Sequence, residues 1–239
     1  MQGETYSKGF ASFQAGVRAC VPTILGYVGI GIAAGVVGKG AGLSLLEIAL
    51  LSIVVYAGSA QFIISGMILL GSPLSAIVLT TFLVNLRHFL MSLSVASFFR
   101  KESLLATIGV GTLLTDESYG VLMTAIQNGK KVSVPWTNGL NVTAYLTWII
   151  STIIGGLLGS WIPNPEIFGL DFALTAMFIG LIVLQTELPL KQKGKQTVIT
   201  LLSVSFSLYW LMAIFSAEMS VLIATLIGCT VGMVSANED

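Results

Sequence analysis

The sequence of 239 residues is strongly apolar: hydrophobic residues make up 55% of it and charged residues 9%, and the mean hydropathy is +0.92. Soluble domains carry about 25% charged residues, so the composition excludes an ordinary soluble protein and predicts an all-α, polytopic membrane protein in a lipid bilayer. The formal net charge is zero, and no long basic run is interleaved with aromatic residues, which argues against nucleic acid as a partner.

Apolar stretches occupy nearly the whole chain, and we predict one integral membrane transporter domain over residues 1–239. About eight spans are expected, since each needs about 20 apolar residues. They cover residues 21–37, 43–71, 74–98, 103–127, 140–162, 167–184, 197–216 and 219–234. This leaves no room for a soluble domain, so any chemistry lies inside the membrane.

Basic residues in the loops predict the orientation of the chain, because cytoplasmic loops carry an excess of lysine and arginine. The basic loop 191–195 and the pair 130–131 are expected in the cytoplasm, and the turn 163–166 outside. The N-terminus then lies in the cytoplasm. Arg100 and Lys101 would lie outside, so either the bias is locally violated or one interrupted segment is re-entrant and the count of eight is wrong.

Glycines recur at helical spacing in the first and fifth spans. Gly31 and Gly35 form a GxxxG pair, and Gly155, Gly156 and Gly159 form a second set. Small residues at such spacing let two helix backbones approach closely. We therefore expect helix-packing faces at these positions rather than ligand sites.

The second segment, 43–71, is too long for one upright span. As an unbroken helix it would run about 43 Å, against a hydrocarbon core of about 30 Å. Its middle, from Tyr56 to Gln61, holds small residues and one amide, and Gly58 is a place where the backbone could bend or unwind. We predict a discontinuous pair of half-helices. Glu47, near the start, fits helix N-terminal charge or interfacial exposure as well as a coupling role.

The third span places Asn85, Arg87 and His88 close to the centre of the bilayer. An arginine at that depth costs roughly 2.5 to 3.5 kcal/mol on insertion scales. It is normally tolerated only where it faces a carboxylate or a watered cavity. The sequence therefore predicts such a partner elsewhere in the chain.

The fourth span has its midpoint near Thr115 and carries Asp116 and Glu117 directly after it. Neighbouring residues on a helix point about 100° apart. The two carboxylates therefore cannot face the same partner, and we expect one of them to face an interior pocket while the other pairs or is protonated.

Polar groups thus recur at the same depth in three different segments. We predict that Gly58, Ser59, Gln61, Asn85 and Arg87 bind substrate and that Asp116, Glu117 and His88 couple transport to protons. A cation, carboxylates and free backbone dipoles in a low-dielectric pocket are the groups needed to hold a zwitterionic α-amino acid. The alternative is a buried ion pair between Arg87 and Asp116 that only ties two spans together.

Metal and cysteine chemistry find little support. Cys20 and Cys229 lie in apolar surroundings without a CxxC motif, and His88 is the single histidine. We expect two packed cysteines, with no disulfide framework, no metal site and no cofactor. No Ser/His/Asp grouping indicates an enzyme.

A faint internal similarity pairs residues 47–52 with residues 171–176, each after a glycine-rich span. Transporters are often built from two repeats with discontinuous helices at the midplane. We keep an internal repeat as one open interpretation of this pattern.

Three motifs carry a resemblance that covers essentially the whole chain: Gly58-Ser-Ala-Gln-Phe62, Asn85-Leu-Arg-His88 and Thr115-Asp-Glu-Ser-Tyr119. In this order and spacing they resemble the AzlC-type large subunits of bacterial branched-chain amino acid exporters, the LIV-E family. The resemblance implies export of leucine, isoleucine and valine across the bacterial plasma membrane. It also implies proton antiport and a small AzlD-type membrane subunit as partner.

Two other functions stay open on the residues alone. A channel or facilitator for a small polar solute would keep a continuous wet path without proton coupling. A membrane scaffold that transports nothing would use the charged residues only as an inert ion pair. Buried carboxylates such as Asp116 and Glu117 argue mildly against the channel.

Overall fold

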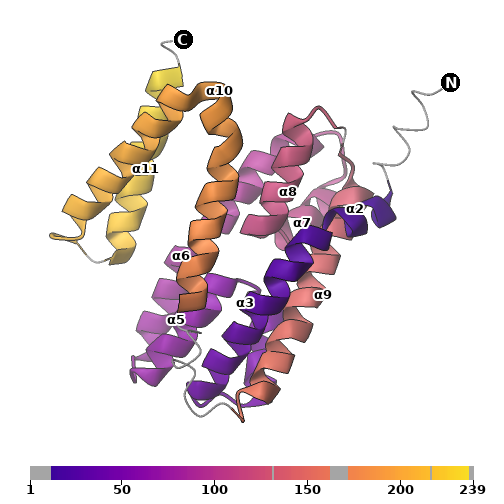
Figure 1. Ribbon diagram of the computed structural model, residues 1–239, viewed down its shortest axis with the longest axis vertical. Coiled ribbons are helices and arrows are strands. Elements are labelled where there is room, and N and C mark those ends of the chain that lie inside the picture. Colours follow the sequence, from indigo (N-terminus) through magenta and orange to yellow (C-terminus); the bar gives the residue numbers. More distant parts are fainter. Residues whose placement is uncertain (1–11, 131, 162–171, 216, 237–239) are drawn as a thin grey trace. The chain divides into compact units, whose positions relative to one another are not determined.

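The computed structural model describes residues 12–130, 132–161, 172–215 and 217–236. Within these ranges the regular structure is entirely helical, as the composition predicts. The elements are α2 (Phe13–Ala19), α3 (Val21–Gly40), α4 (Leu45–Leu50), η1 (Leu51–Val55), α5 (Gly58–Leu69), α6 (Leu74–Ala96), η2 (Ser97–Phe99), α7 (Leu104–Thr112), α8 (Asp116–Gln127), α9 (Val134–Leu158), α10 (Ala173–Leu211) and α11 (Ala217–Ala236) (Figure 1). They fall into two compact units, Met1–Met177 and Phe178–Asp239. The single domain over the whole chain stays a prediction.

Three helical segments in the described ranges are long and apolar enough to cross a membrane: Val21–Gly40, Leu74–Phe99 and Val134–Leu158. Shorter apolar helical stretches cover Leu45–Val55, Gly58–Leu69 and Met219–Ser235. The all-α membrane fold is therefore confirmed, whereas the count of eight spans stays a prediction.

The first unit is built on the pair α3 and α9, which lie side by side (Figure 1). A Cβ atom on Gly35 would meet the carbonyl oxygen of Thr152 in α9, and one on Gly155 would meet the backbone of Ile32 in α3. The predicted packing faces of the first and fifth spans therefore exist, and they pack against each other. Such close backbone contact fixes the register of two apolar helices. In a bilayer, burial of apolar surface contributes little free energy to their association.

The bounds of both helices differ from the prediction: α3 continues to Gly40 instead of ending at 37, and α9 runs from Val134 to Leu158 instead of 140–162. A short helix, α2, precedes α3 and packs against the start of α9, where Gly16 and Gly139 lie against the backbone of the opposite helix. The fifth span begins at Val134 rather than at 140, because Ser133 caps it by accepting a hydrogen bond from the Trp136 backbone N–H. A serine followed by a proline in the first turn is a typical helix start.

The predicted break in segment 43–71 lies just before Gly58 rather than at it. The helical run α4–η1 ends at Val55, Tyr56 adopts a left-handed conformation with φ 41°, Ala57 is extended, and α5 begins at Gly58. A left-handed tyrosine is strained and persists only where its surroundings hold it. Here the Tyr145 hydroxyl of α9 donates to the Ile53 carbonyl at 2.9 Å, which pairs a backbone group near the break.

The start of the same segment explains Glu47. Its carboxylate accepts from the Ser44 backbone N–H at 2.7 Å while Ser44 Oγ accepts from the Glu47 N–H at 3.2 Å. This reciprocal capping box satisfies two of the free N–H groups at the start of α4. Glu47 is therefore a helix-capping residue.

The fourth predicted span, 103–127, is not one helix, and this corrects the sequence analysis. It forms α7 and α8, separated by Leu113, Leu114 and Thr115. Thr115 Oγ1 accepts from the Ser118 N–H, and Ser118 Oγ accepts from the Thr115 N–H at 2.9 Å. The chain stops and restarts because this motif followed by acidic residues is a helix N-terminus signal.

The second unit is a helical hairpin followed by α11. The predicted loop 191–195 is much shorter than expected, because only Lys193 departs from helical geometry, and the ribbon of α10 reverses direction there (Figure 1). The second half of α10 packs on α11, where Gln196 Nε2 donates to the Gly232 carbonyl at 2.9 Å. The turn 163–165, the first residues of the sixth span and Asp171 lie outside the described residues, so the proposed repeat stays a prediction.

The two cysteines have different environments. Cys20 is buried, as predicted, but Cys229 is exposed on α11, so the expectation of two packed cysteines is wrong for that residue.

The contact between α3 and α9 leads to a first prediction. Leucine at Gly35 would be forced into the backbone of α9, so Gly35→Leu should lower the stability of the protein by about 3 kcal/mol. Gly29→Leu on the same helix is the matched control, because a Cβ at Gly29 meets no atom within 4 Å. Thermal unfolding in detergent measures both. Equal melting temperatures for the two variants would contradict this packing.

Candidate functional site

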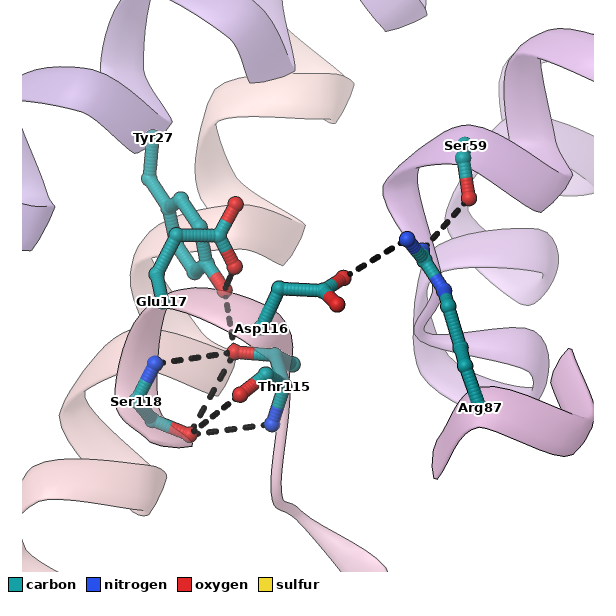
Figure 2. A network of polar contacts seen from close by, with 7 residues as sticks. All are labelled: Tyr27, Ser59, Arg87, Thr115, Asp116, Glu117 and Ser118. Atoms are coloured by element: carbon teal, nitrogen blue, oxygen red, sulfur yellow. Dashed lines mark hydrogen bonds and ion pairs between the residues drawn. The ribbon is translucent and has the colours of Figure 1, made fainter. Parts of the chain in front are cut away.

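Arg87 joins three segments that are distant in sequence. Its Nη1 lies 3.0 Å from Asp116 Oδ2 at the start of α8, and its Nη2 donates to Ser59 Oγ at 2.6 Å in the first turn of α5 (Figure 2). The Arg87 and Asp116 side chains are 26% and 16% exposed. The carboxylate partner predicted for the mid-span arginine is therefore confirmed, and it is Asp116.

The second carboxylate points elsewhere, as predicted from the helical geometry. The Tyr27 hydroxyl of α3 donates to Glu117 Oε2 at 2.7 Å and lies 2.6 Å from Thr115 Oγ1 (Figure 2). Among the described residues Glu117 forms no ion pair. Adjacent residues thus present one carboxylate that is paired with a cation and one that is held only by a neutral donor.

Two helix N-termini meet at this site and differ in charge. The N-terminus of α8 is capped by Thr115 and has Asp116 and Glu117 in its first turn, so its positive end is compensated within the helix. The N-terminus of α5 has neither a side-chain cap nor an acidic residue in its first turn. The free N–H groups and positive dipole of α5 are therefore available to an anion.

A small cavity lies among these groups. Its walls come from α3, the first break, α5, α6, α8 and α9, and its lining residues are Tyr27, Tyr56, Ala57, Gly58, Ser59, Arg87, His88, Thr115, Asp116, Glu117 and Trp148. The cavity measures about 10 Å³, enough for the centre of about one water molecule. This space is too small for a molecule of the size of an amino acid.

Six of the eight predicted site residues line this cavity, and two do not. Gln61 is buried beside it, and its Oε1 accepts from Trp148 Nε1 at 3.1 Å. Asn85 is partly buried on α6, with an Oδ1 atom that forms no hydrogen bond to a described residue. His88 lines the cavity next to Arg87. The structure thus brings together all three predicted segments, while the binding roles themselves stay predictions.

The comparisons with known proteins agree with this arrangement. The sequence profile of the family described as AzlC protein matches residues 22–162, which include every residue that lines the cavity. The chain belongs to the AzlC family.

Three relatives show how far the similarity extends. The inner membrane protein YgaZ of Escherichia coli is 28% identical over 95% of this chain and 92% of its own length. The branched-chain amino acid transport protein AzlC of Bacillus subtilis is 29% identical over 82% of this chain and 75% of its own length. An uncharacterized membrane protein of Archaeoglobus fulgidus is 30% identical over 72% of this chain and 75% of its own. No solved structure matches the chain. These similarities support a membrane transport role.

Sequence analysis missed three aromatic residues of the site in this AzlC-family chain. Tyr27 and Trp148 lie in apolar helices, where nothing in the sequence separates them from lipid-facing aromatics, yet they are 3% and 2% exposed and their rings pack edge to face at 5.1 Å. Tyr56 is different, because its position at the start of the polar interruption is a signal that could have been used. Its hydroxyl lies near those of Tyr27 and Thr115 without a hydrogen bond of ordinary geometry to a described residue.

Among the described residues no group of three or more histidine, cysteine, aspartate or glutamate side chains could hold a metal ion. The chemistry that the site offers is therefore ionic: one guanidinium, two carboxylates and one uncompensated helix N-terminus. Such a set is suited to a small molecule that carries both charges.

Gly58 has a role that sequence analysis did not foresee. A Cβ atom at this position would lie 2.9 Å from Trp148 Cη2 and 3.2 Å from Trp148 Cζ2. The absence of a side chain lets the indole ring close one side of the cavity against the start of α5. Gly58 is therefore required for close approach, and the unwinding itself takes place at Tyr56 and Ala57.

This contact gives a second prediction. Gly58→Val should destabilise the protein and distort the start of α5, because valine cannot occupy the space of the indole ring. Trp148→Phe makes room, so the double variant should be little less stable than Trp148→Phe alone. Thermal unfolding of all four proteins in a double-mutant cycle tests the coupling. Additive losses would show that Trp148 is not what excludes a side chain at Gly58.

Proposed function

We propose that this protein is a permease subunit that exports the branched-chain amino acids leucine, isoleucine and valine by proton antiport, together with a small AzlD-type membrane subunit. The observation that carries the proposal is the bridge from Ser59 through Arg87 to Asp116, which brings three polar interruptions to one cavity. The name of the Bacillus relative, a branched-chain amino acid transport protein, supports the substrate class.

The proposed substrate is a zwitterion, and its two charges correspond to those of the ion pair between Arg87 and Asp116. The α-carboxylate replaces Asp116 at the planar fork of Arg87 and is further stabilised by the uncapped N-terminus of α5. The α-ammonium then takes the place of the guanidinium beside Asp116. Each charge of the protein exchanges one partner for another, so opening the ion pair leaves no buried charge without a counter-charge.

The two interrupted segments are, in this proposal, discontinuous transmembrane helices. Segments 43–71 and 103–127 each consist of two helical pieces, and the second piece of each begins at the cavity. Irregular backbone is tolerated at membrane depth only where it lines a cavity or is buried in protein. Small rotations at these breaks would let the site open to alternate sides of the membrane.

Antiport requires that substrate and proton exclude each other from the site, and Glu117 has the right position for this. It lines the cavity and lacks a cation among the described residues. A buried carboxyl without a counter-ion favours the neutral form, whereas an arriving ammonium favours the charged form. Substrate that binds from the cytoplasm therefore expels a proton there, and release outside allows another proton to bind. His88, next to Arg87, is the second candidate for the proton.

The closed cavity supports a carrier over the channel alternative, because a space of about 10 Å³ offers no continuous wet path. The scaffold alternative predicts that the ion pair is inert. Localisation in the bacterial plasma membrane, with the N-terminus in the cytoplasm, completes the proposal and agrees with relatives that are named as membrane proteins.

The third prediction tests Arg87. Arg87→Lys should reduce leucine counterflow in proteoliposomes at least tenfold, because lysine keeps the charge but lacks the planar fork that holds a carboxylate with two parallel hydrogen bonds. Arg100→Lys, at an exposed position beyond η2, is the matched control and should transport normally. Normal leucine transport by Arg87→Lys would remove Arg87 from the substrate site and favour the inert ion pair.

The fourth prediction separates the two carboxylates. In inside-out vesicles Glu117→Gln should still exchange leucine, but an acidic lumen should no longer drive its accumulation, because glutamine cannot release a proton. Asp116→Asn should lose both exchange and accumulation, because it leaves Arg87 without its carboxylate. If Glu117→Gln still concentrates leucine in response to the gradient, Glu117 is not the proton carrier, and the same assay on His88→Gln decides the remaining candidate.

A further inference from the structure

A second, larger cavity lies between α6 and α7 and shares His88 with the cavity at Arg87. Its volume is about 340 Å³. Two nearly buried valines, Val95 at 2% and Val110 at 1% exposure, form its floor from opposite helices, whereas Phe89 and Ile108 at its rim are 64% and 53% exposed, so the cavity is open on one side. The shape is held in place, because Asn141 of α9 donates to the Val110 carbonyl at 2.9 Å.

The hydroxyl groups that line this larger cavity are already used by the backbone. Ser92 donates to the Gly111 carbonyl, Thr107 to the Ser103 carbonyl and Thr112 to the Ile108 carbonyl, at 3.3, 3.2 and 2.8 Å. None of these three donors is left to hydrogen-bond a polar ligand. Apart from His88 and the acceptor oxygens of these hydroxyls, the cavity offers apolar contact, and a polar side chain that entered it would lose most of its hydrogen bonds to water.

We propose that this cavity receives the aliphatic side chain of the substrate whose charged end is held at Arg87 and Asp116. The inference rests on the proposed function and adds to it the compartment that determines side-chain specificity. Continuity is the main argument: His88 lines both cavities, and the chain passes from Thr112 at the end of the apolar wall to Thr115 and Asp116 at the polar site within four residues.

Size and chemistry agree with this occupant. An apolar cavity of about 150 Å³ is enough to bind benzene, so 340 Å³ accommodates the three- or four-carbon chains of valine, leucine and isoleucine. One methylene more or less in an apolar pocket changes specificity by about 10- to 200-fold. The cavity therefore selects branched aliphatic side chains over polar ones strongly and over smaller apolar ones moderately.

The test fills the cavity from its α7 wall. A Cβ atom at Gly111 would lie 3.4 Å from Ser92 Oγ, an ordinary contact, so Gly111→Ala is tolerated and Gly111→Leu places its side chain in the cavity. Gly109→Leu is the matched control, because Gly109 lies on the same helix, does not line the cavity and has open space around its Cβ position. Counterflow of labelled leucine, valine and alanine is measured in proteoliposomes for each protein.

Gly111→Leu should lower the ratio of leucine to alanine transport at least tenfold, Gly111→Ala should lower it less, and Gly109→Leu should leave it unchanged. Ala96→Leu, from the α6 wall, should shift it in the same direction and decides the matter if Gly111→Leu is inactive. An unchanged ratio of leucine to alanine transport in the active variants overturns the inference. If Gly111→Leu leaves that ratio unchanged but no longer associates with a small membrane subunit, the cavity is a subunit contact and the inference is also overturned. A wild-type protein that transports none of the three amino acids, either alone or reconstituted with a small AzlD-type subunit, refutes the proposed function itself.

Discussion

The structure depends on the counter-charge of Arg87. A guanidinium in the middle of a long apolar helix is normally tolerated in a bilayer only beside a carboxylate or a watered cavity, and Asp116 lies 3.0 Å from it. That requirement links α6 to α8, and the hydrogen bond to Ser59 links α6 to α5. The charges that hold the site together are the ones that we propose bind the substrate, and in that proposal the ligand that separates them supplies both signs of charge.

In the proposed arrangement α5 and α8 begin inside the membrane, where the backbone groups at a helix end must find partners within the protein. α9 supplies polar side chains for both breaks. Tyr145 pairs the Ile53 carbonyl near the first break, and Asn141 pairs the Val110 carbonyl in the last turn of α7 before the second. The close packing of α3 on α9 holds this support in place, because Gly35 and Gly155 admit no side chain between the two helices. The helix pair α3 and α9 therefore stabilises both breaks next to the site.

Much of this could be predicted from the sequence, for identifiable reasons. An arginine in the middle of a span needs a counter-charge, and only Asp116 and Glu117 are predicted at a similar depth in another span. The free-energy cost of an unpaired arginine in the bilayer was therefore enough to predict that these segments meet. The break before α8 was missed because hydropathy treats 103–127 as one stretch, although Thr115 and Ser118 flank two acidic residues as at a helix start. Tyr27 and Trp148 could not be found, because burial against a partner helix is decided by tertiary packing.

In the mechanism we propose, a charged and an apolar compartment divide proton coupling and side-chain selectivity between them. Nearly all α-amino acids carry the same α-ammonium and α-carboxylate, whatever their side chain. The charged compartment therefore cannot discriminate among side chains, but it can exchange an ammonium for a proton. In this proposal the apolar compartment receives the side chain, and because its hydroxyl donors are occupied by helix carbonyls, a polar side chain finds few hydrogen-bond partners there. His88 lies where the two compartments meet. A substrate therefore engages both only when it carries an aliphatic chain on a zwitterion, and such a ligand has the charges needed to replace the bond between Arg87 and Asp116.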